Sequence, residues 1–295
     1  MNKTNILDQI SLLDKPYIIY RSKNGFTLYT NFSKKIILTK KNISNFLKKT
    51  DQKKKRIKKT DLYVGFFGYE LLNDLIKVKI PKQKETNFPK GIFYKPEEII
   101  NLSENLKYQP EKSSKIDTKF KINIDRKNYT KIFNKFKNKI KKGETYQIKI
   151  CTKYRNKSKI DPLDYFCRLT KTNLAPEAFL IKDKEYSIIS CSPETLIIKK
   201  GNSISTKPIA GTLKKNSKLN KNKALNYFRK NIKETKEHNM IVDMERNDLS
   251  RICLPGTVKI TKEKIVEEYK DLYHYVSLIN GKLKKIFKIL ISSKP

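Results

Sequence analysis

The sequence predicts an α+β protein whose strands form antiparallel sheet. Two segments carry apolar residues at helical spacing, residues 126–142 and about 220–245, and a series of short alternating segments lies between them. This order of helix, strands and helix lacks the regular strand–helix–strand alternation that builds a parallel sheet. The sequence also shows no internal repeat. We therefore expect an antiparallel arrangement with helices beside it.

The first third of the chain predicts β-structure. Apolar positions alternate over residues 17–39 and are interrupted by Asn24-Gly25, a pair typical of a tight hairpin turn. Glycines at positions 65 and 68 suit a strand that another backbone approaches closely. The further elements expected here are a strand over 62–70, a short helix over 71–76 and a strand near 91–94.

The rest of the chain predicts two helices and several strands. Residues 126–142 form an amphipathic helix that Gly143 ends. The long helix over about 220–245 has its apolar side at Leu225, Phe228, Ile232 and Ile241. The strands expected between these helices cover residues 145–151, 178–181, 186–191, 196–199 and 203–206.

The composition is strongly basic, but it does not by itself predict a nucleic-acid partner. The 295 residues include 67 Lys and Arg against 29 Asp and Glu, which gives a net charge of +38. Only eight of the cations are Arg, the residue that base-edge readout and bidentate phosphate contacts favour. The Lys excess accompanies abundant Asn, Ile and Tyr, as expected for a genome rich in A and T. We therefore expect no nucleic-acid partner, while anionic small substrates remain compatible.

The cysteines and apolar runs indicate a soluble protein of a reducing compartment. The four cysteines include no C-x-x-C pair, so neither a zinc site nor a disulfide framework is expected. No stretch approaches the roughly 18 apolar residues that a membrane span requires. The amino end lacks the apolar run and cleavage pattern of a signal peptide. We expect a cytoplasmic protein with no membrane partner.

The long helix carries a candidate metal site. Glu234, Glu237 and His238 stand at i, i+3 and i+4, so their side chains project from one side of the helix. Two carboxylates without soft ligands suit Mg²⁺, which takes oxygen donors. The alternative is a solvated helix face on which the glutamates pair with Lys230 and Lys233.

Six sequence blocks follow one another between residue 65 and residue 281. The blocks are Gly65-Phe66-Phe67-Gly68-Tyr69-Glu70, Gly143-Glu144-Thr145-Tyr146-Gln147, Ser192-Pro193-Glu194, Pro208-Ile209-Ala210-Gly211-Thr212, the segment from Lys233-Glu234 through Asp248-Leu249, and His274-Tyr275-Val276-Ser277 with Gly281. In this order they resemble the chorismate-utilising enzymes, a family that includes anthranilate synthase component I, aminodeoxychorismate synthase component I, and the isochorismate and salicylate synthases. Six blocks in register are far more specific than any one of them.

The resemblance implies a role for individual residues. Glu234 and Glu237 match the glutamates at the family's Mg²⁺ site, where the cation holds the ring carboxylate of chorismate. Glu194 matches the acid/base carboxylate beside the departing C4 hydroxyl. His274 matches the histidine associated with pyruvate elimination. The substrate-binding residues implied are those of the loop that lines the carboxylate pocket, Ala210, Gly211 and Thr212.

Two positions point to one branch of the family. Isochorismate-type enzymes resemble one another in a lysine base where this chain has Gln147, so ammonia is the more plausible nucleophile here. Many aminodeoxychorismate synthases carry a lysine nucleophile where this chain has Ala210. The combination is typical of anthranilate synthase component I, a lyase of tryptophan biosynthesis that aminates chorismate with ammonia from a glutamine amidotransferase subunit. The alternative is an aminodeoxychorismate synthase of folate biosynthesis.

The resemblance also implies a fold and an incomplete copy of it. The family fold packs two antiparallel sheets face to face with helices around them. We expect residues 1–120 to form its amino-terminal β-rich part and residues 121–295 its catalytic region. Past Gly281 the family continues with a glycine-rich strand pair and an acidic segment that supplies another Mg²⁺ ligand. Neither is found before Pro295, so a truncated chain, or a catalytically dead remnant, is expected.

Overall fold

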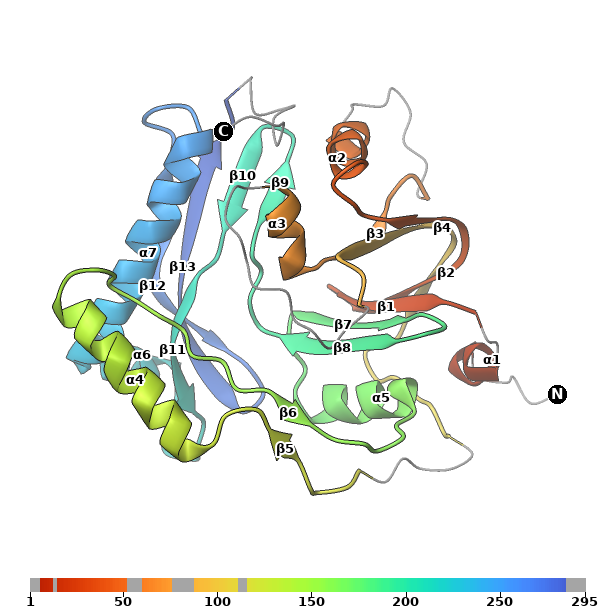
Figure 1. Cartoon of the computed structure of the whole chain (residues 1–295), viewed down its shortest axis with the longest axis horizontal. Helices are drawn as coiled ribbons and strands as arrows, with labels where there is room; N and C mark the ends of the chain where they lie inside the picture. Colours follow the sequence, from red (N-terminus) through yellow and green to blue (C-terminus); the bar gives the residue numbers. More distant parts are fainter. Residues whose placement is uncertain (1–5, 13–14, 52–59, 76–87, 111–115, 285–295) are drawn as a thin grey trace. The chain divides into compact units, whose positions relative to one another are not determined.

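The computed structural model describes residues 6–12, 15–51, 60–75, 88–110 and 116–284 (Figure 1). The chain divides into two compact units. One comprises residues 1–108 and 166–295, and the other comprises residues 109–165. The candidate residues at 194, 210–212, 234, 237 and 274 all belong to the first unit, which we call the main unit. The predicted division at residue 120 stays a prediction.

A six-stranded antiparallel sheet forms the first half of the main unit. Its strand order is β3-β4-β2-β1-β7-β8. The predicted hairpin is confirmed, since β1 pairs with β2 and Ser22 lies opposite Gly25. Gly25 has a φ of +136°, and a Cβ there would lie 2.3 Å from the carbonyl oxygen of Leu102. The strands are β1 (Tyr17–Ser22), β2 (Gly25–Ile37), β3 (Val64–Phe67), β4 (Gly91–Leu102), β7 (Glu177–Lys182) and β8 (Ser187–Ser192).

Short helices accompany this sheet. Phe166 of α5 packs edge-on against Phe26 of β2, with ring centroids 5.6 Å apart. A cluster of Leu38, Ile43, Phe46 and Leu71 ties α2 and η1 to the sheet. The predicted helix over 71–76 is present as η1 and α3, and residue 76 lies outside the described residues. The helices are α1 (Ile6–Leu12), α2 (Ile43–Asp51), η1 (Tyr69–Leu71), α3 (Leu72–Leu75) and α5 (Pro162–Thr172).

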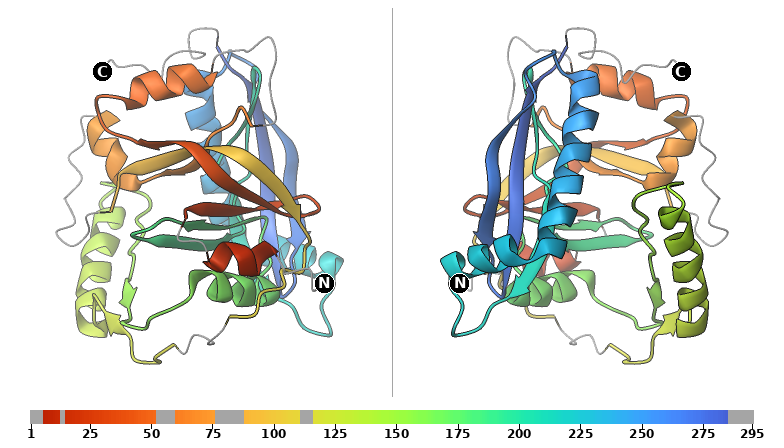
Figure 2. Two further views of the ribbon diagram at one scale, coloured as in Figure 1. Left: turned by 90° about the vertical axis from the view of Figure 1, so that its right-hand side faces the viewer. Right: turned by 90° about the vertical axis from the view of Figure 1, so that its left-hand side faces the viewer.

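A second, five-stranded antiparallel sheet carries Ala210, Gly211, Thr212 and His274 among the candidate residues. The long strand β13 pairs with β12 on one side and with β10 and β11 on the other, and β9 continues from β10. Helices α6 and α7 pack against this sheet, and Figure 2 shows α7 running along it. The elements are β9 (Ile198–Lys200), β10 (Ser203–Thr206), β11 (Ile209–Lys214), α6 (Lys221–Lys230), α7 (Ile232–Ile252), β12 (Lys259–Glu268) and β13 (Leu272–Lys282).

Two apolar clusters join these helices to the second sheet. Ala224 and Phe228 of α6 pack on Val266, Tyr273 and Tyr275. The ring of Phe228 stacks on that of Tyr275 with centroids 4.9 Å apart. A second cluster, further along α7, consists of Ile204, Val242, Leu249, Cys253, Ile279 and Leu283. The core of this half therefore lies between the helices and one face of the sheet.

The expected single helix over 220–245 is wrong, because two helices meet at Asn231. Asn231 has extended backbone angles (φ −84°, ψ 101°), and its side chain accepts a hydrogen bond from the backbone N–H of Glu234. Asparagine at this position satisfies a free N–H of the first turn, which starts a new helix. The second helix also runs further than predicted, to Ile252.

The unit of residues 109–165 is small and built around one helix. Helix α4 (Arg126–Lys141) confirms the prediction, and Gly143 follows it with a φ of +74°. Strand β5 (Lys121–Ile122) pairs with β6 (Tyr154–Arg155). The predicted strand over 145–151 is wrong, and β5 pairs with residues 154–155 instead. Alternating apolar residues favour a strand, but a strand also needs a neighbour to pair with.

The predicted fold class is confirmed. Every strand pair within the described residues is antiparallel, and helices flank the sheets. Among the described helices, none is long and apolar enough to span a bilayer.

Candidate functional site

A distorted segment of β11 lies at the centre of the candidate site. The strand pairs with β13 through Ile209 opposite Val276 and Thr212 opposite His274, and the register shifts between these two pairs. Gly211 sits in the shifted segment with a φ of +106°. A Cβ at this position would lie 3.1 Å from Oε2 of Glu234 and 3.0 Å from the ring of Phe228. Only glycine therefore lets the strand approach the α7 carboxylate this closely.

The first turn of α7 places Glu234 beside this segment. The Asn231 cap holds the turn through its 3.2 Å bond with the backbone N–H of Glu234. Glu234 and Glu237 are both half-buried. Within the described part of the chain, neither carboxylate forms an ion pair, so the alternative of pairs with Lys230 and Lys233 is not observed.

His238 is fully buried and connects α7 to three strands. Its Nδ1 lies 3.2 Å from the carbonyl oxygen of Ala210, and its Nε2 lies 2.7 Å from Oγ of Ser277. A carbonyl can only accept, so Nδ1 carries the proton and Nε2 accepts from the serine. The Ser277 oxygen in turn accepts from the backbone N–H of Lys264 at 3.0 Å. Burial lowers the pKa of His238 and keeps the ring neutral.

His274 lies on the opposite face of the second sheet. Its neighbour Tyr275 faces the helices, and adjacent residues of a strand point to opposite faces. Nδ1 of His274 lies 3.0 Å from Oγ1 of Thr212. Burial lowers the pKa of His274 and outweighs the opposing effects of the Gly211 carbonyl and of the Glu267 and Glu194 carboxylates. The imidazole is therefore a neutral group near acids.

Three further residues surround His274, and we call them the Glu267 brace: Lys207, Glu267 and Tyr269. Glu267 lies opposite His274 in the β12–β13 pair. Lys207 Nζ donates to its two oxygens at 3.1 and 2.8 Å, and the Tyr269 hydroxyl donates to it at 2.8 Å. Burial opposes the charge on Glu267, but these donors outweigh it and the pKa is lowered. The Tyr269 ring stands edge-on to His274, with centroids 4.9 Å apart.

Glu194 approaches the start of β11 from the β8–β9 connection. Its side chain is exposed, and its Oε1 accepts from the backbone N–H of Ile209 at 3.5 Å. The next residue, Thr195, donates a hydrogen bond to Glu177 of β7. Glu245 of α7 is a further acid in this region. Its pKa is raised by burial and, to a smaller extent, by Asp248 and Glu194.

The structure brings most of the predicted site residues to the β11 segment and leaves two apart from it. Glu237 is one turn of α7 after Glu234, and its side chain forms no hydrogen bond to a described residue. Gln147 is exposed and belongs to the unit of residues 109–165, so its role stays a prediction. The residues that contact or flank the segment are Glu194, Ala210, Gly211, Thr212, Glu234 and His274.

The donor set at Glu234 and Glu237 suits Mg²⁺ in kind but is small. Both ligands would be carboxylate oxygens, and Mg²⁺ commonly combines one or two carboxylates with water and substrate oxygens. Among the described residues, no group of three or more His, Cys, Asp or Glu side chains is arranged to hold a metal ion. The two glutamates therefore fit an open site in which substrate supplies the remaining ligands.

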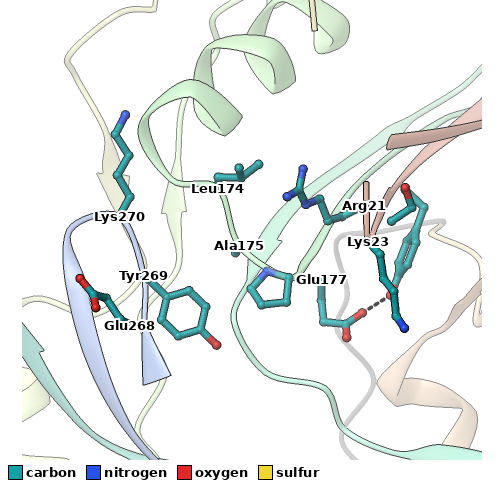
Figure 3. Close-up of a pocket in the computed structure, with 11 residues that line it drawn as sticks. Arg21, Lys23, Leu174, Ala175, Glu177, Glu268, Tyr269 and Lys270 are labelled. Carbon is teal, nitrogen blue, oxygen red and sulfur yellow. Dashed lines mark hydrogen bonds between the residues drawn. The ribbon is translucent and has the colours of Figure 1, made fainter. Parts of the chain in front are cut away.

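A separate hollow of about 770 Å³ lies in the main unit between the two sheets' loops (Figure 3). The residues after α5, including Ala175 and Glu177, form one wall, and the β12–β13 turn with Tyr269 forms the other. Tyr20 of β1 donates a hydrogen bond to Glu177 in this hollow. Tyr269 thus contributes both to the hollow and to the surroundings of His274.

Sequence reasoning missed the Glu267 brace. Glu267 and Tyr269 precede a Lys270-Asp271 turn, and alternating residues resume at Leu272, which is the pattern of a hairpin. That pattern would have placed Glu267 opposite His274. Lys207 offers no comparable signal, because its contact depends on where the β10–β11 connection runs.

Three comparisons place these features among known proteins. Anthranilate synthase component 1 of Saccharolobus solfataricus is 30% identical over 240 residues, which are 77% of this chain and 57% of that protein. Aminodeoxychorismate synthase component 1 of Bacillus subtilis is 32% identical over 156 residues, which are 52% of this chain and 33% of that protein. The crystal structure of anthranilate synthase component I from Streptococcus pneumoniae TIGR4 shares the fold, with a TM-score of 0.70 at 21% identity over 93% of this chain and 69% of that chain.

The chain spans about half the length of the curated relatives it matches, between 50% and 57% for the first three. The family described as chorismate binding enzyme matches residues 15–291, which include both sheets and all the candidate site residues. The resemblance found in the six sequence blocks is confirmed by this match, and the chain belongs to the chorismate binding enzyme family.

Proposed function

We propose that the chain is a chorismate-utilising lyase of the anthranilate synthase component I type. Its reaction would convert chorismate and ammonia into anthranilate, pyruvate and water. The observation that carries the proposal is that one short segment of β11 is contacted by all three residues: Glu194 at Ile209, Glu234 at Gly211 from the helix side and His274 at Thr212 from the other face. Acids, a neutral imidazole and a glycine backbone along one segment are the kinds of group that this chemistry requires.

Each residue has a chemical task in this proposal. The backbone of Gly211 and the hydroxyl of Thr212 would bind the substrate carboxylate. Glu194, which is exposed beside β11, would exchange a proton at the departing C4 hydroxyl. His274 is neutral, so its imidazole can accept the proton that the ring loses as it becomes aromatic.

Glu234 and Glu237 would hold Mg²⁺, which supplies charge to bind the ring carboxylate and to polarise the reacting position. The Asn231 cap and the close approach of Gly211 fix the position of Glu234. Ammonia would come from a separate glutamine amidotransferase subunit. Gln147 and Ala210 support amination without a lysine nucleophile, which favours anthranilate as the product.

The alternative product is 4-amino-4-deoxychorismate. The match to the Bacillus subtilis aminodeoxychorismate synthase component 1 favours this alternative. The two functions differ in whether pyruvate is released, because the amino-deoxy product retains the enolpyruvyl group. Measuring pyruvate therefore separates them.

Purified protein incubated with chorismate, Mg²⁺ and ammonium tests the proposal. We expect anthranilate fluorescence and an equal amount of pyruvate. Glu234→Gln should abolish both, whereas Glu263→Gln, an exposed glutamate of β12 paired with Lys264, should leave both unchanged. An aminated product without pyruvate would favour the alternative. Failure to bind chorismate in calorimetry, with or without Mg²⁺, would overturn both.

A further inference from the structure

Two residues contact the His274 ring, and the proposed chemistry of His274 gives a role to only one of them, Thr212. Thr212 lies at Nδ1 on one side, and the Tyr269 ring stands against the imidazole on another. We propose that Tyr269 and Glu267 are positioning residues that hold the His274 imidazole in one orientation, with Nε2 directed away from Thr212. The inference rests on the proposed function only in taking His274 as the catalytic imidazole.

The Tyr269 ring is fixed at both of its ends. Its backbone closes the β12–β13 turn, with its N–H donating to the carbonyl of Leu272 at 2.8 Å. Its hydroxyl donates to the Glu267 carboxylate at 2.8 Å. A hydrogen bond to a charged acceptor is about twice as strong as a neutral one. The ring therefore cannot rotate away from His274 without breaking this bond.

The Lys207–Glu267 pair differs from an ordinary surface ion pair. Both side chains are largely covered, with 23% and 29% of their areas exposed, and the lysine engages both carboxylate oxygens. The next residue of the strand offers a direct contrast. Glu268 points to the opposite face, pairs with Lys215 and has 47% of its side chain exposed. Only the first pair can orient a group near the candidate site.

The charges that face His274 come from four elements. Glu267 lies on β12, Glu194 on the β8–β9 connection and Lys207 before β11, while β11 itself contributes the Gly211 carbonyl. Glu267 and Glu194 raise the pKa of the imidazole, and Lys207 lowers it. The two members of one ion pair thus act on His274 in opposite directions, which makes the proposal measurable.

The chain has only two histidines, so their ring protons can be followed separately by NMR. We expect Glu267→Gln to lower the pKa of His274, because a negative charge is removed, and Lys207→Met to raise it. Glu268→Gln is the matched control and should leave it unchanged. The His238 signal should not move in any of these variants, and His274→Gln assigns the two signals.

Tyr269 is tested by two substitutions that separate its ring from its hydroxyl. Tyr269→Leu removes the ring and should lower kcat roughly tenfold or more, with KM for chorismate changed by less than about twofold, because misorientation affects the reacting group rather than binding. Tyr269→Phe keeps the ring and should have a smaller effect. Glu268→Gln should leave kcat and thermal stability as they are.

The titration arm does not depend on turnover. If the wild-type protein forms no product, the proposed function fails, while opposite shifts of the His274 pKa in the Glu267 and Lys207 variants still show that this ion pair faces the imidazole, as the inference requires. An unchanged His274 titration in both variants would overturn the inference. A Tyr269→Leu variant that keeps the wild-type kcat would overturn the role of the ring.

Discussion

The two histidines of the chain lie on opposite faces of one sheet, and their surroundings differ. His238 packs on Tyr275 on the helix-covered face, and both of its nitrogens are bonded, to Ala210 and Ser277. His274 faces the other way, with a hydroxyl at one nitrogen and carboxylates nearby. Both rings are buried and neutral. Burial alone therefore does not distinguish a structural histidine from the proposed catalytic one, and the two rings differ instead in the groups that surround them.

Removing each ring should give the largest difference between the two histidines. His238→Ala should lower the free energy of unfolding by roughly 3–4 kcal/mol, because it leaves a cavity and two polar groups without partners. His274→Ala should cost only about 1–2 kcal/mol while abolishing turnover. Urea denaturation followed by circular dichroism measures both. Equal losses would show that the two histidines contribute equally to the free energy of unfolding.

A second test concerns Gly211, which lies between the two faces. Gly211→Ala should cost about 2–3 kcal/mol, because φ is +106° and the new Cβ would meet Phe228, Glu234 and Tyr275 at 3.0–3.1 Å. Gly256 is the matched control, since its φ is +74° with no atom within 4 Å of an added Cβ. Gly256→Ala should cost about 1 kcal/mol. Thermal unfolding compares the two, and similar losses would mean that crowding at Gly211 is unimportant.

A third test uses the two asparagine caps on the helix side. Asn220 caps α6 through the N–H of Lys223, and Asn231 caps α7 through the N–H of Glu234. Replacing either by Ala should cost about 1 kcal/mol of stability. Only Asn231→Ala should also weaken Mg²⁺-dependent chorismate binding, because it releases the turn that carries Glu234. Calorimetry measures chorismate binding by both variants in the presence of Mg²⁺. Equal affinities would show that the Asn231 cap does not affect the candidate site.

The fold could be predicted where local signals agree with the final pairing. Asn24-Gly25 predicted the first hairpin, because the geometry of a tight turn requires a residue such as Gly25. Apolar residues at helical spacing, ending at Gly143, predicted α4. The break at Asn231 was missed, because apolar residues continue at helical spacing across it. Its signal was the cap itself, an asparagine three residues before a glutamate.

The site could be predicted only as far as sequence blocks reach. Motifs identified Glu194, Gly211 and His274 as candidates, whereas the Glu267 brace depends on strand register that no motif contains. Helical spacing placed His238 on the same side as Glu234, but it could not show that helix packing directs the imidazole into the sheet. Tertiary contacts, rather than local pattern, therefore separate the two histidines.

A smaller effect is a dependence of stability on pH, to which both buried histidines contribute. Burial holds the pKa of His274 below its usual 6.5. As pH falls below 6.5 the unfolded chain takes up a proton that the folded chain does not, so stability is lost until pH passes the lowered pKa. His274→Gln removes this contribution and should flatten the fall in unfolding free energy between pH 7 and 5.

Glu267→Gln should have the opposite effect in the same window. Without the carboxylate, the pKa of His274 falls further, and the difference in proton uptake between the unfolded and folded chains extends to lower pH. The Glu267 carboxylate itself contributes to stability in a different pH range. Its pKa is lowered in the folded chain, so the stability that it adds is lost only as pH falls below the usual glutamate pKa of 4.5. Urea titrations at several pH values separate the two windows. A Glu267→Gln curve that overlays the wild type between pH 7 and 5 would mean that the carboxylate does not act on His274, and the two faces would then differ in hydrogen bonding alone.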